Sequence, residues 1–265
     1  SNVRHTPTST LIIIMQQYGL LGYPLGHSFS ARYFADKFER EHIDATYSNF
    51  EYARVDEAIQ HLLQMPHLVG FNVTIPHKQA VMPYLTSLSP EAEAIGAVNV
   101  VCVRHTTDGQ TLLHGCNSDV IGFKESIRPL LRCDVHKRAL VLGTGGASKA
   151  VMFGLKQLGL TPTYVSRTPA EGRFTYDDLT AEVMNQYKVI VNCSPVGMFP
   201  KVEACPAIPY DRLTPDHLLY DLVYNPLDTL FMKRGAEQGA VVKNGLEMLH
   251  LQAEAAWQMW HNEAM

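Results

Sequence analysis

RALVLGTGGASKA, residues 138–150, is the stretch that decides the fold of this chain. Apolar residues 139–142 run directly into Gly143-Thr144-Gly145-Gly146, and small residues that can begin a helix follow. This order of strand, glycine turn and helix N-terminus is typical of an anion-binding site. The backbone N–H groups of the turn and the positive end of the helix dipole can both interact with the anion. Glycine suits the turn because a side chain would collide with a phosphate lying on it, and because a positive φ costs glycine little. The spacing is not the common G-x-G-x-x-G, so the stretch alone is also compatible with an ordinary strand–helix turn.

Strand-like and helix-like segments alternate from residue 138 onward, which is typical of a parallel sheet with crossover helices. After the first strand we expect strands at 163–165, 188–191, 218–223 and 241–242, and helices at 147–158, 229–239 and 246–261. Ser166-Arg167-Thr168 follows the second strand, where the adenosine ribose of a dinucleotide lies in such folds. An acidic residue there selects NAD, whereas an Arg accommodates the 2′-phosphate of NADP, and no Asp or Glu occurs before Glu171. The pattern favours NADP, with a solvent-facing Arg167 as the alternative.

Two serines stand out in the first part of the chain. A loop of turn-forming residues, 22–30, ends in Ser28 and Ser30, and a helix is expected from there to residue 41 with Ser30 as its N-cap. The two hydroxyls either bind a small carboxylate beside the helix N-terminus, or one caps the helix and the other lies in the loop.

Three further places combine polar residues with apolar strands. The strand expected at 69–75 contains an Asn and a Thr, which need partners if they are buried, and Lys78 follows at the expected start of a helix. Lys78 is either functional or an ordinary surface lysine. The apolar run around Asn99 repeats this theme. After a strand at 112–116, Asp119 either caps the next helix or contacts a substrate.

Composition narrows the possible functions. The 265 residues carry a formal charge of −4 and are 46% hydrophobic, which describes a globular protein and gives no electrostatic case for nucleic acid or a membrane as partner. The five cysteines form no C-x-x-C pair, and the twelve histidines form no H-E-x-x-H motif or tight cluster. We therefore expect no disulfide frame and no metal, and free thiols indicate a reducing, cytoplasmic location.

The first 14 residues differ from the rest. Residues 1–10 are polar, and the apolar run at 11–14 is too short for a signal sequence or a membrane span. Because Met15 is a natural start, we expect residues 1–14 to be an added extension whose deletion changes neither activity nor melting temperature.

The motifs together resemble the shikimate dehydrogenase family, from about residue 18 to residue 257. The matching motifs are Gly22-x-Pro24-x-x-His27-Ser28-x-Ser30, Asn72-Val73-Thr74-x-Pro76-x-Lys78, Gly96-Ala97-Val98-Asn99, Asn117-x-Asp119-x-x-Gly122, Gly143-x-Gly145-Gly146-Ala147-Ser148, Arg167-Thr168, Asp221-x-Val223-Tyr224-x-Pro226 and Gly245-x-x-Met248-Leu249-x-x-Gln252. Each motif is weak or moderate alone, but their order and spacing are specific.

The resemblance implies an α/β fold of two domains with the active site between them. Residues 15–117 and 243–265 would form an α/β substrate domain to which the C-terminal helix returns, and residues 118–242 a Rossmann-like NADP-binding domain. The catalytic pair would be Lys78 and Asp119. The implied substrate-binding residues are Ser28, Ser30, Thr74, Asn99, Tyr224 and Gln252. The implied cofactor-binding residues are Gly143, Thr144, Gly145, Gly146, Ala147, Ser166, Arg167, Thr168, Val223 and Gly245.

The implied reaction is the reversible NADPH-dependent reduction of 3-dehydroshikimate to shikimate, a step in chorismate and aromatic amino acid biosynthesis. A lysine is protonated at neutral pH, so Lys78 can give a proton to the carbonyl oxygen, and a carboxylate such as Asp119 favours its charged form. A quinate/shikimate dehydrogenase that uses NAD, and a non-catalytic NADP-sensing protein on the same scaffold, are the competing interpretations. Both a monomer and a homodimer fit the sequence.

Overall fold

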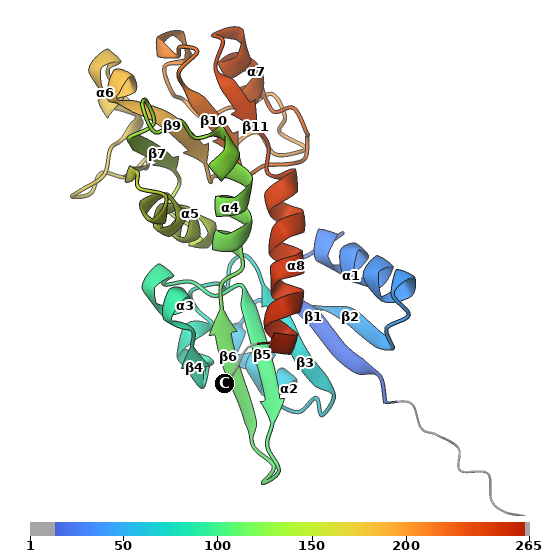
Figure 1. Cartoon of the computed structure of the whole chain (residues 1–265). Helices are drawn as coiled ribbons and strands as arrows, with labels where there is room; N and C mark the ends of the chain where they lie inside the picture. The colour runs from blue at the N-terminus through green and yellow to red at the C-terminus, as the bar shows by residue number, and fades with distance from the viewer. Residues whose placement is uncertain (1–13, 263–265) are drawn as a thin grey trace, which may run out of the picture.

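The computed structural model describes residues 14–262, which form two β-sheets connected by long helices (Figure 1). Of the extension expected at residues 1–14, only Ile14 lies within the described range. No helix in that range combines the length and apolar character needed to cross a bilayer. Residues 14–262 also contain no group of three or more His, Cys, Asp or Glu side chains placed to hold a metal ion.

The first sheet is mixed and has the strand order β2-β1-β3-β5-β6-β4. Its strands are β1 (Gln16–Gly22), β2 (Ala45–Glu51), β3 (Leu68–Val73), β4 (Ser87–Leu88), β5 (Val100–His105) and β6 (Thr111–Cys116). Strand β1 lies between β2 and β3 and is parallel to both, whereas β5 is antiparallel to β3 and β6. The helices associated with this sheet are α1 (Phe29–Arg40), α2 (Val55–Leu62) and α3 (Pro90–Ile95).

Apolar side chains at helical spacing pack the helices onto this sheet. In α2 the buried residues are Val55, Ala58, Ile59 and Leu62, a single stripe that packs in one cluster with Phe71 of β3. A second cluster, formed with α1 and α8 (Leu246–Asn262), includes Trp260, whose indole nitrogen donates to the carbonyl of Val101 at 3.1 Å. Trp260 is therefore a core residue, with only 7% of its surface exposed.

The second sheet is entirely parallel, with the order β11-β10-β9-β7-β8. Its strands are β7 (Arg138–Leu142), β8 (Thr161–Val165), β9 (Tyr187–Asn192), β10 (Leu218–Asp221) and β11 (Val241–Lys243). The helices that accompany it are α4 (Asp119–Ile127), α5 (Gly146–Gln157), α6 (Ala181–Gln186) and α7 (Leu230–Glu237). Continuous apolar strands buried between helices are the expected signature of a parallel sheet, and the predicted βαβ alternation is confirmed.

Helices α4 and α8 lie side by side between the two sheets (Figure 1). Gly122 makes this close approach possible, because a Cβ at this position would lie 2.6 Å from the carbonyl oxygen of Met248. From this contact α8 runs back onto the first sheet, as expected for the C-terminal helix.

Candidate active site

A cavity of about 460 Å³ opens between the two sheets, where loops after β1 and β3 face the beginnings of α4, α5 and α8. It brings together every predicted catalytic and substrate-binding residue. From the predicted cofactor set it includes Ala147 and Gly245.

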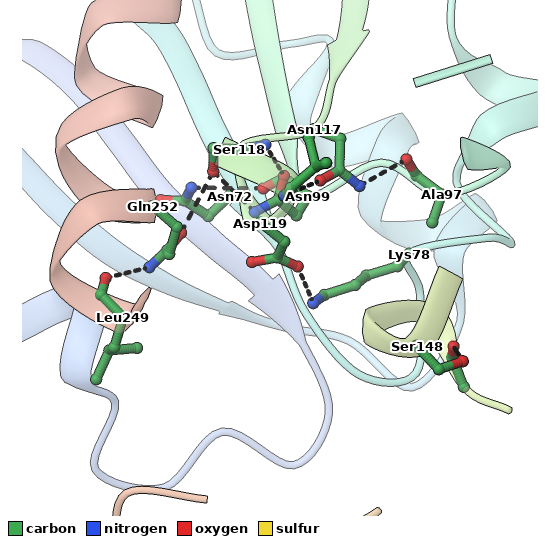
Figure 2. Close-up of polar contacts among 12 residues, drawn as sticks. Asn72, Lys78, Ala97, Asn99, Asn117, Ser118, Asp119, Ser148, Leu249 and Gln252 are labelled. Atoms are coloured by element: carbon green, nitrogen blue, oxygen red, sulfur yellow. Dashed lines mark hydrogen bonds and ion pairs between the residues drawn. The ribbon is translucent and has the colours of Figure 1, made fainter. Parts of the chain in front are cut away.

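Lys78 and Asp119 form the charged centre of this cavity. The Lys78 ammonium nitrogen lies 2.7 Å from Asp119 Oδ2, and the two side chains are only 13% and 11% exposed (Figure 2). Lys78 was expected at the start of a helix, and this expectation is wrong: the residue lies in a turn after β3. A hydrogen bond holds this turn in place, since the Lys78 carbonyl accepts from the Val98 N–H at 2.8 Å. An ion pair with so little solvent competition holds the ammonium group in one place.

Asp119 is the first residue of α4, but it does not provide the cap. The side chain of Asn117 accepts a hydrogen bond from the Val120 N–H at 3.2 Å and so takes the capping role that was the alternative for Asp119. The Asp119 carboxylate is therefore free to pair with Lys78, and the positive end of the α4 dipole favours a negative charge at this position.

A network of amides and hydroxyls forms one wall of the cavity (Figure 2). The Asn99 amide bonds twice to Ser118, accepting from its backbone N–H at 2.7 Å and donating to its hydroxyl at 2.9 Å. The Ser118 hydroxyl donates to Gln252 Oε1 at 3.4 Å, and the Gln252 amide donates to the carbonyl of Leu249. These bonds orient polar side chains from the middle of the chain and from its C-terminal helix, and the array suits a ligand that carries several hydroxyl groups.

Ser28, rather than Ser30, is the N-cap of α1. Its backbone is extended, with φ −87° and ψ 138°, and its hydroxyl accepts from the Ala31 N–H at 3.1 Å. The expectation for Ser30 was wrong because the helix begins at Phe29, which places Ser30 inside the first turn. Both hydroxyls nevertheless line the cavity beside a helix N-terminus, an arrangement that attracts an anion.

The glycine turn between β7 and α5 has the properties of a phosphate cradle. Gly143 has φ +103°, a conformation that L side chains rarely adopt, and a Cβ on Gly145 would meet no atom within 4 Å. At Gly146 a Cβ would lie 3.0 Å from Lys78 Cβ, so the turn borders the Lys78–Asp119 pair. The open backbone at Gly145 fits a group that approaches closely, such as a dinucleotide pyrophosphate.

The remaining predicted cofactor residues do not line the cavity. Gly143, Thr144, Gly145 and Gly146 form the turn itself, while Ser166, Arg167 and Thr168 follow β8 and Val223 follows β10. Arg167 is exposed, and the Ser166 hydroxyl accepts from the Thr168 N–H at 3.2 Å. All of them follow carboxyl ends of parallel strands, the edge at which such sheets bind ligands.

No role was predicted for two polar residues at strand ends, of which only Asn72 lines the cavity. Asn72 lines the cavity, and its Oδ1 accepts from the Tyr47 hydroxyl at 2.8 Å. Asp221 ends β10 and accepts from Thr229 and Asn192, while burial raises its pKa to about 6. Asn72 was noted from sequence as a polar residue in an apolar strand, and the same signal at the end of β10 could have singled out Asp221.

Comparisons with other proteins agree with this geometry. Residues 20–101 match the family described as the shikimate dehydrogenase substrate binding domain. A shikimate dehydrogenase (NADP(+)) of Bacillus mycoides is 34% identical in an alignment of 262 positions that covers 92% of each chain. The structure of the Thermus thermophilus shikimate 5-dehydrogenase in complex with NADP(H) and shikimate superposes with a TM-score of 0.80 at 30% identity, over 94% of both chains.

The Aquifex aeolicus shikimate dehydrogenase has a TM-score of 0.81 at 30% identity and covers 95% of this chain, with 94% of its own chain matched. Identity at this level over nearly the full length, with the Lys–Asp pair and the glycine turn meeting at one cavity, leads to one conclusion. The chain belongs to the shikimate dehydrogenase family.

Proposed function

We propose that the chain catalyses the reversible NADPH-dependent reduction of 3-dehydroshikimate to shikimate. The Lys78–Asp119 pair carries this proposal, because it sits at 2.7 Å in a cavity bordered by a phosphate-type glycine turn on one side and two serines at a helix N-terminus on the other. Bacillus mycoides and Thermus thermophilus relatives bear names that state the same substrate and cofactor.

Lys78 and Asp119 divide the proton chemistry between them. In the direction of reduction, the Lys78 ammonium donates a proton to the carbonyl oxygen as the alcohol forms. In the direction of oxidation, the amine takes the proton of the same hydroxyl. Asp119 holds the ammonium in position and compensates its charge while the lysine is protonated.

Residues around the pair bind and orient the ring. Ser28 and Ser30 donate to the carboxylate beside the α1 N-terminus, with Tyr224 nearby. Thr74, Asn99 and Gln252 contact the ring hydroxyls and the reacting carbonyl. Since all of these side chains line the cavity, a ring anchored by its carboxylate can present its carbonyl to Lys78.

NADP would lie along the carboxyl edge of the second sheet. The fit rests on the open backbone at Gly145 and on the positive φ of Gly143, which leave room for a pyrophosphate at the start of α5. When bound, the cofactor supplies or accepts the hydride. Arg167 binds the adenosine 2′-phosphate, flanked by Ser166 and Thr168. Thr144, Gly146, Ala147, Val223 and Gly245 complete the cofactor set.

We propose the same ranges for the domains as the sequence analysis, with residues 15–117 and 243–265 binding substrate and residues 118–242 binding cofactor. A cytoplasmic location and either a monomer or a homodimer belong to this proposal as well. Sedimentation of the purified protein distinguishes the two oligomeric states.

Initial rates of nicotinamide reduction test the function directly, with shikimate and quinate each combined with NADP⁺ and NAD⁺. We expect shikimate with NADP⁺ to exceed the other three pairs. A preference for quinate or NAD⁺ would indicate the rival dehydrogenase. NADP⁺ binding without turnover of any pair would indicate the sensor.

A further inference from the structure

A buried pair of side chains joins the carboxyl ends of β9 and β10. Asn192 is the last residue of β9 and Asp221 the last residue of β10, and the two residues are partners across the sheet. Both are fully buried. Asn192 Nδ2 donates to Asp221 Oδ1 at 3.1 Å, so the two strand ends are connected by side chains as well as by the backbone.

Asp221 fixes the segment that leaves β10. Its Oδ1 also accepts from the Val223 N–H at 3.0 Å, and the Val223 carbonyl accepts from the Gly245 N–H at 3.3 Å. The packing here is close, because a Cβ on Gly245 would overlap the Leu222 carbonyl oxygen. Leu222 and Gly245 line the cavity, whereas Asp221 does not. The carboxylate therefore holds a wall of the cavity from behind.

Asn192 fixes the segment that leaves β9. Its Oδ1 accepts from the Ser194 N–H at 3.1 Å and from the Ser194 hydroxyl at 2.6 Å. Ser194 lies against the glycine turn, since a Cβ on Gly143 would be 3.3 Å from the Ser194 nitrogen. The Asn192 side chain thus sets the position of the residue that packs on the turn.

The bonds at Asp221 suit an ionised carboxylate. Oδ1 accepts from two N–H groups, and Oδ2 accepts from the Thr229 hydroxyl at 2.8 Å. Burial raises the pKa of Asp221 to about 6, which leaves the group mainly ionised at pH 7. An ionised carboxylate offers both oxygens to these donors, whereas a neutral amide has only one acceptor oxygen. Since Thr229 is the N-cap of α7, Oδ2 bonds to that helix, and Oδ1 bonds to the ends of the two strands.

We propose that Asp221 is a positioning residue for the cofactor, which holds the ends of β9 and β10 in the arrangement that receives NADP. This inference rests on the proposed function, which places NADP along this edge of the sheet. Three of the predicted cofactor positions depend on the Asp221–Asn192 pair, because Val223 bonds to Asp221, Gly245 bonds to Val223, and Gly143 packs on Ser194. Segments that are already ordered bind a ligand more tightly than segments that must be ordered by it. Loosening the pair therefore weakens NADP⁺ binding without removing a cofactor contact.

Asp221→Ala and Asn192→Ala test this role by isothermal titration calorimetry with NADP⁺, in the absence of substrate. We expect the Kd for NADP⁺ to rise about ten-fold in each variant, the effect of losing a hydrogen bond to a charged group. The matched control is Thr229→Val. It removes the Oδ2 bond and the cap of α7 but keeps both Oδ1 bonds, so the melting temperature should fall while the Kd changes less than about two-fold.

Asp221→Asn keeps the shape of the buried side chain and serves if the alanine variant does not fold. Because it has one acceptor oxygen in place of two, the Kd for NADP⁺ should rise about three-fold. Amide hydrogen exchange without NADP⁺ should also be faster at Ser194 and Val223 in this variant than in the wild type.

Two results would overturn the inference while the proposed function stands. One is an unchanged Kd for NADP⁺ in folded Asp221→Asn and Asn192→Ala, and the other is an equally large rise in Thr229→Val. A wild-type protein that does not bind NADP⁺ would instead overturn the proposed function and, with it, the role given to Asp221.

Discussion

Replacing Lys78 with alanine removes the cation that pairs with Asp119. Among residues 14–262, no other side chain forms an ion pair with this carboxylate. The substitution takes away the proton donor and leaves the Asp119 carboxylate 11% exposed without its partner. Loss of a general acid typically lowers kcat by about 10²–10⁴, which corresponds to roughly 3–5 kcal/mol of transition-state stabilisation. Since Ser28, Ser30 and the wall around Asn99 stay intact, the KM for shikimate should change only modestly.

Arginine at position 78 separates proton transfer from charge. A guanidinium keeps the positive charge beside Asp119 but does not deprotonate in proteins, so it cannot act as the acid and base. We therefore expect Lys78→Arg to lose kcat almost as strongly as Lys78→Ala, although it restores the ion pair. If Lys78→Arg retained most of the activity, the charge rather than the proton would be the contribution of Lys78.

The assay is the initial rate of NADP⁺ reduction at pH 7, with shikimate and NADP⁺ varied in turn, for both variants and the wild type. Breaking an ion pair with so little exposure also lowers the stability of the protein. The thermal melting of each variant is therefore measured, to establish that the variant is folded in the assay. A folded Lys78→Ala protein that kept more than half of the wild-type kcat would refute the catalytic role.

Three other substitutions probe the cofactor site, the helix contact and the pH dependence. Arg167→Ala should raise the KM for NADP⁺ about 10–100-fold and leave the rate with NAD⁺ unchanged, since a charge-assisted bond to the 2′-phosphate is lost; equal effects on both cofactors would contradict this. Gly122→Ala places a Cβ 2.6 Å from the Met248 carbonyl oxygen, so the free energy of unfolding measured by denaturant titration should fall by about 1–3 kcal/mol. An unchanged midpoint of the unfolding transition would contradict the close packing of α4 on α8. Burial lowers the pKa of His217 from 6.5, and its neutral ring donates to the Met184 carbonyl. The folded state therefore keeps the full contribution of His217 to its stability above pH 6.5 and loses it as the pH falls from 6.5 through the lowered pKa. The melting temperature should thus drop less between pH 7 and 5 in His217→Gln than in the wild type.

The second sheet was largely predictable from sequence, whereas the pairing within the first was not. Strands β7 and β9 contain the continuous apolar runs 139–142 and 189–191, and turns such as Gly143 mark where strands end, so local patterns located them within a few residues. The order β2-β1-β3-β5-β6-β4 depends on contacts between segments far apart in the chain. No local pattern specifies such an order, because register is decided by which side chains meet in the core.

Residue types at the site were also easier to find than their roles. Ser28 and Ser30 are equally good caps by composition, and only the actual start of α1 at Phe29 decides between them. Asp119 had two possible roles until Asn117 was seen to provide the cap. The catalytic role proposed for Lys78 and Asp119 came from the family resemblance, because nothing in the local sequence distinguishes Lys78 from a surface lysine.

The contact between Gly146 and Lys78 changes the explanation of the glycine turn. From sequence, the glycines of the turn were explained by the approach of a phosphate and by the low cost of a positive φ. In the structure the first of these reasons holds for Gly145, where a Cβ would meet open space, but at Gly146 the nearest atoms belong to Lys78, with its Cβ at 3.0 Å and its Cδ at 3.2 Å. A side chain at position 146 would push against the stem of the lysine that pairs with Asp119. The absence of a side chain at Gly146 therefore makes room for Lys78 as well as for the proposed cofactor, and at this contact the glycine turn meets the wall of the cavity.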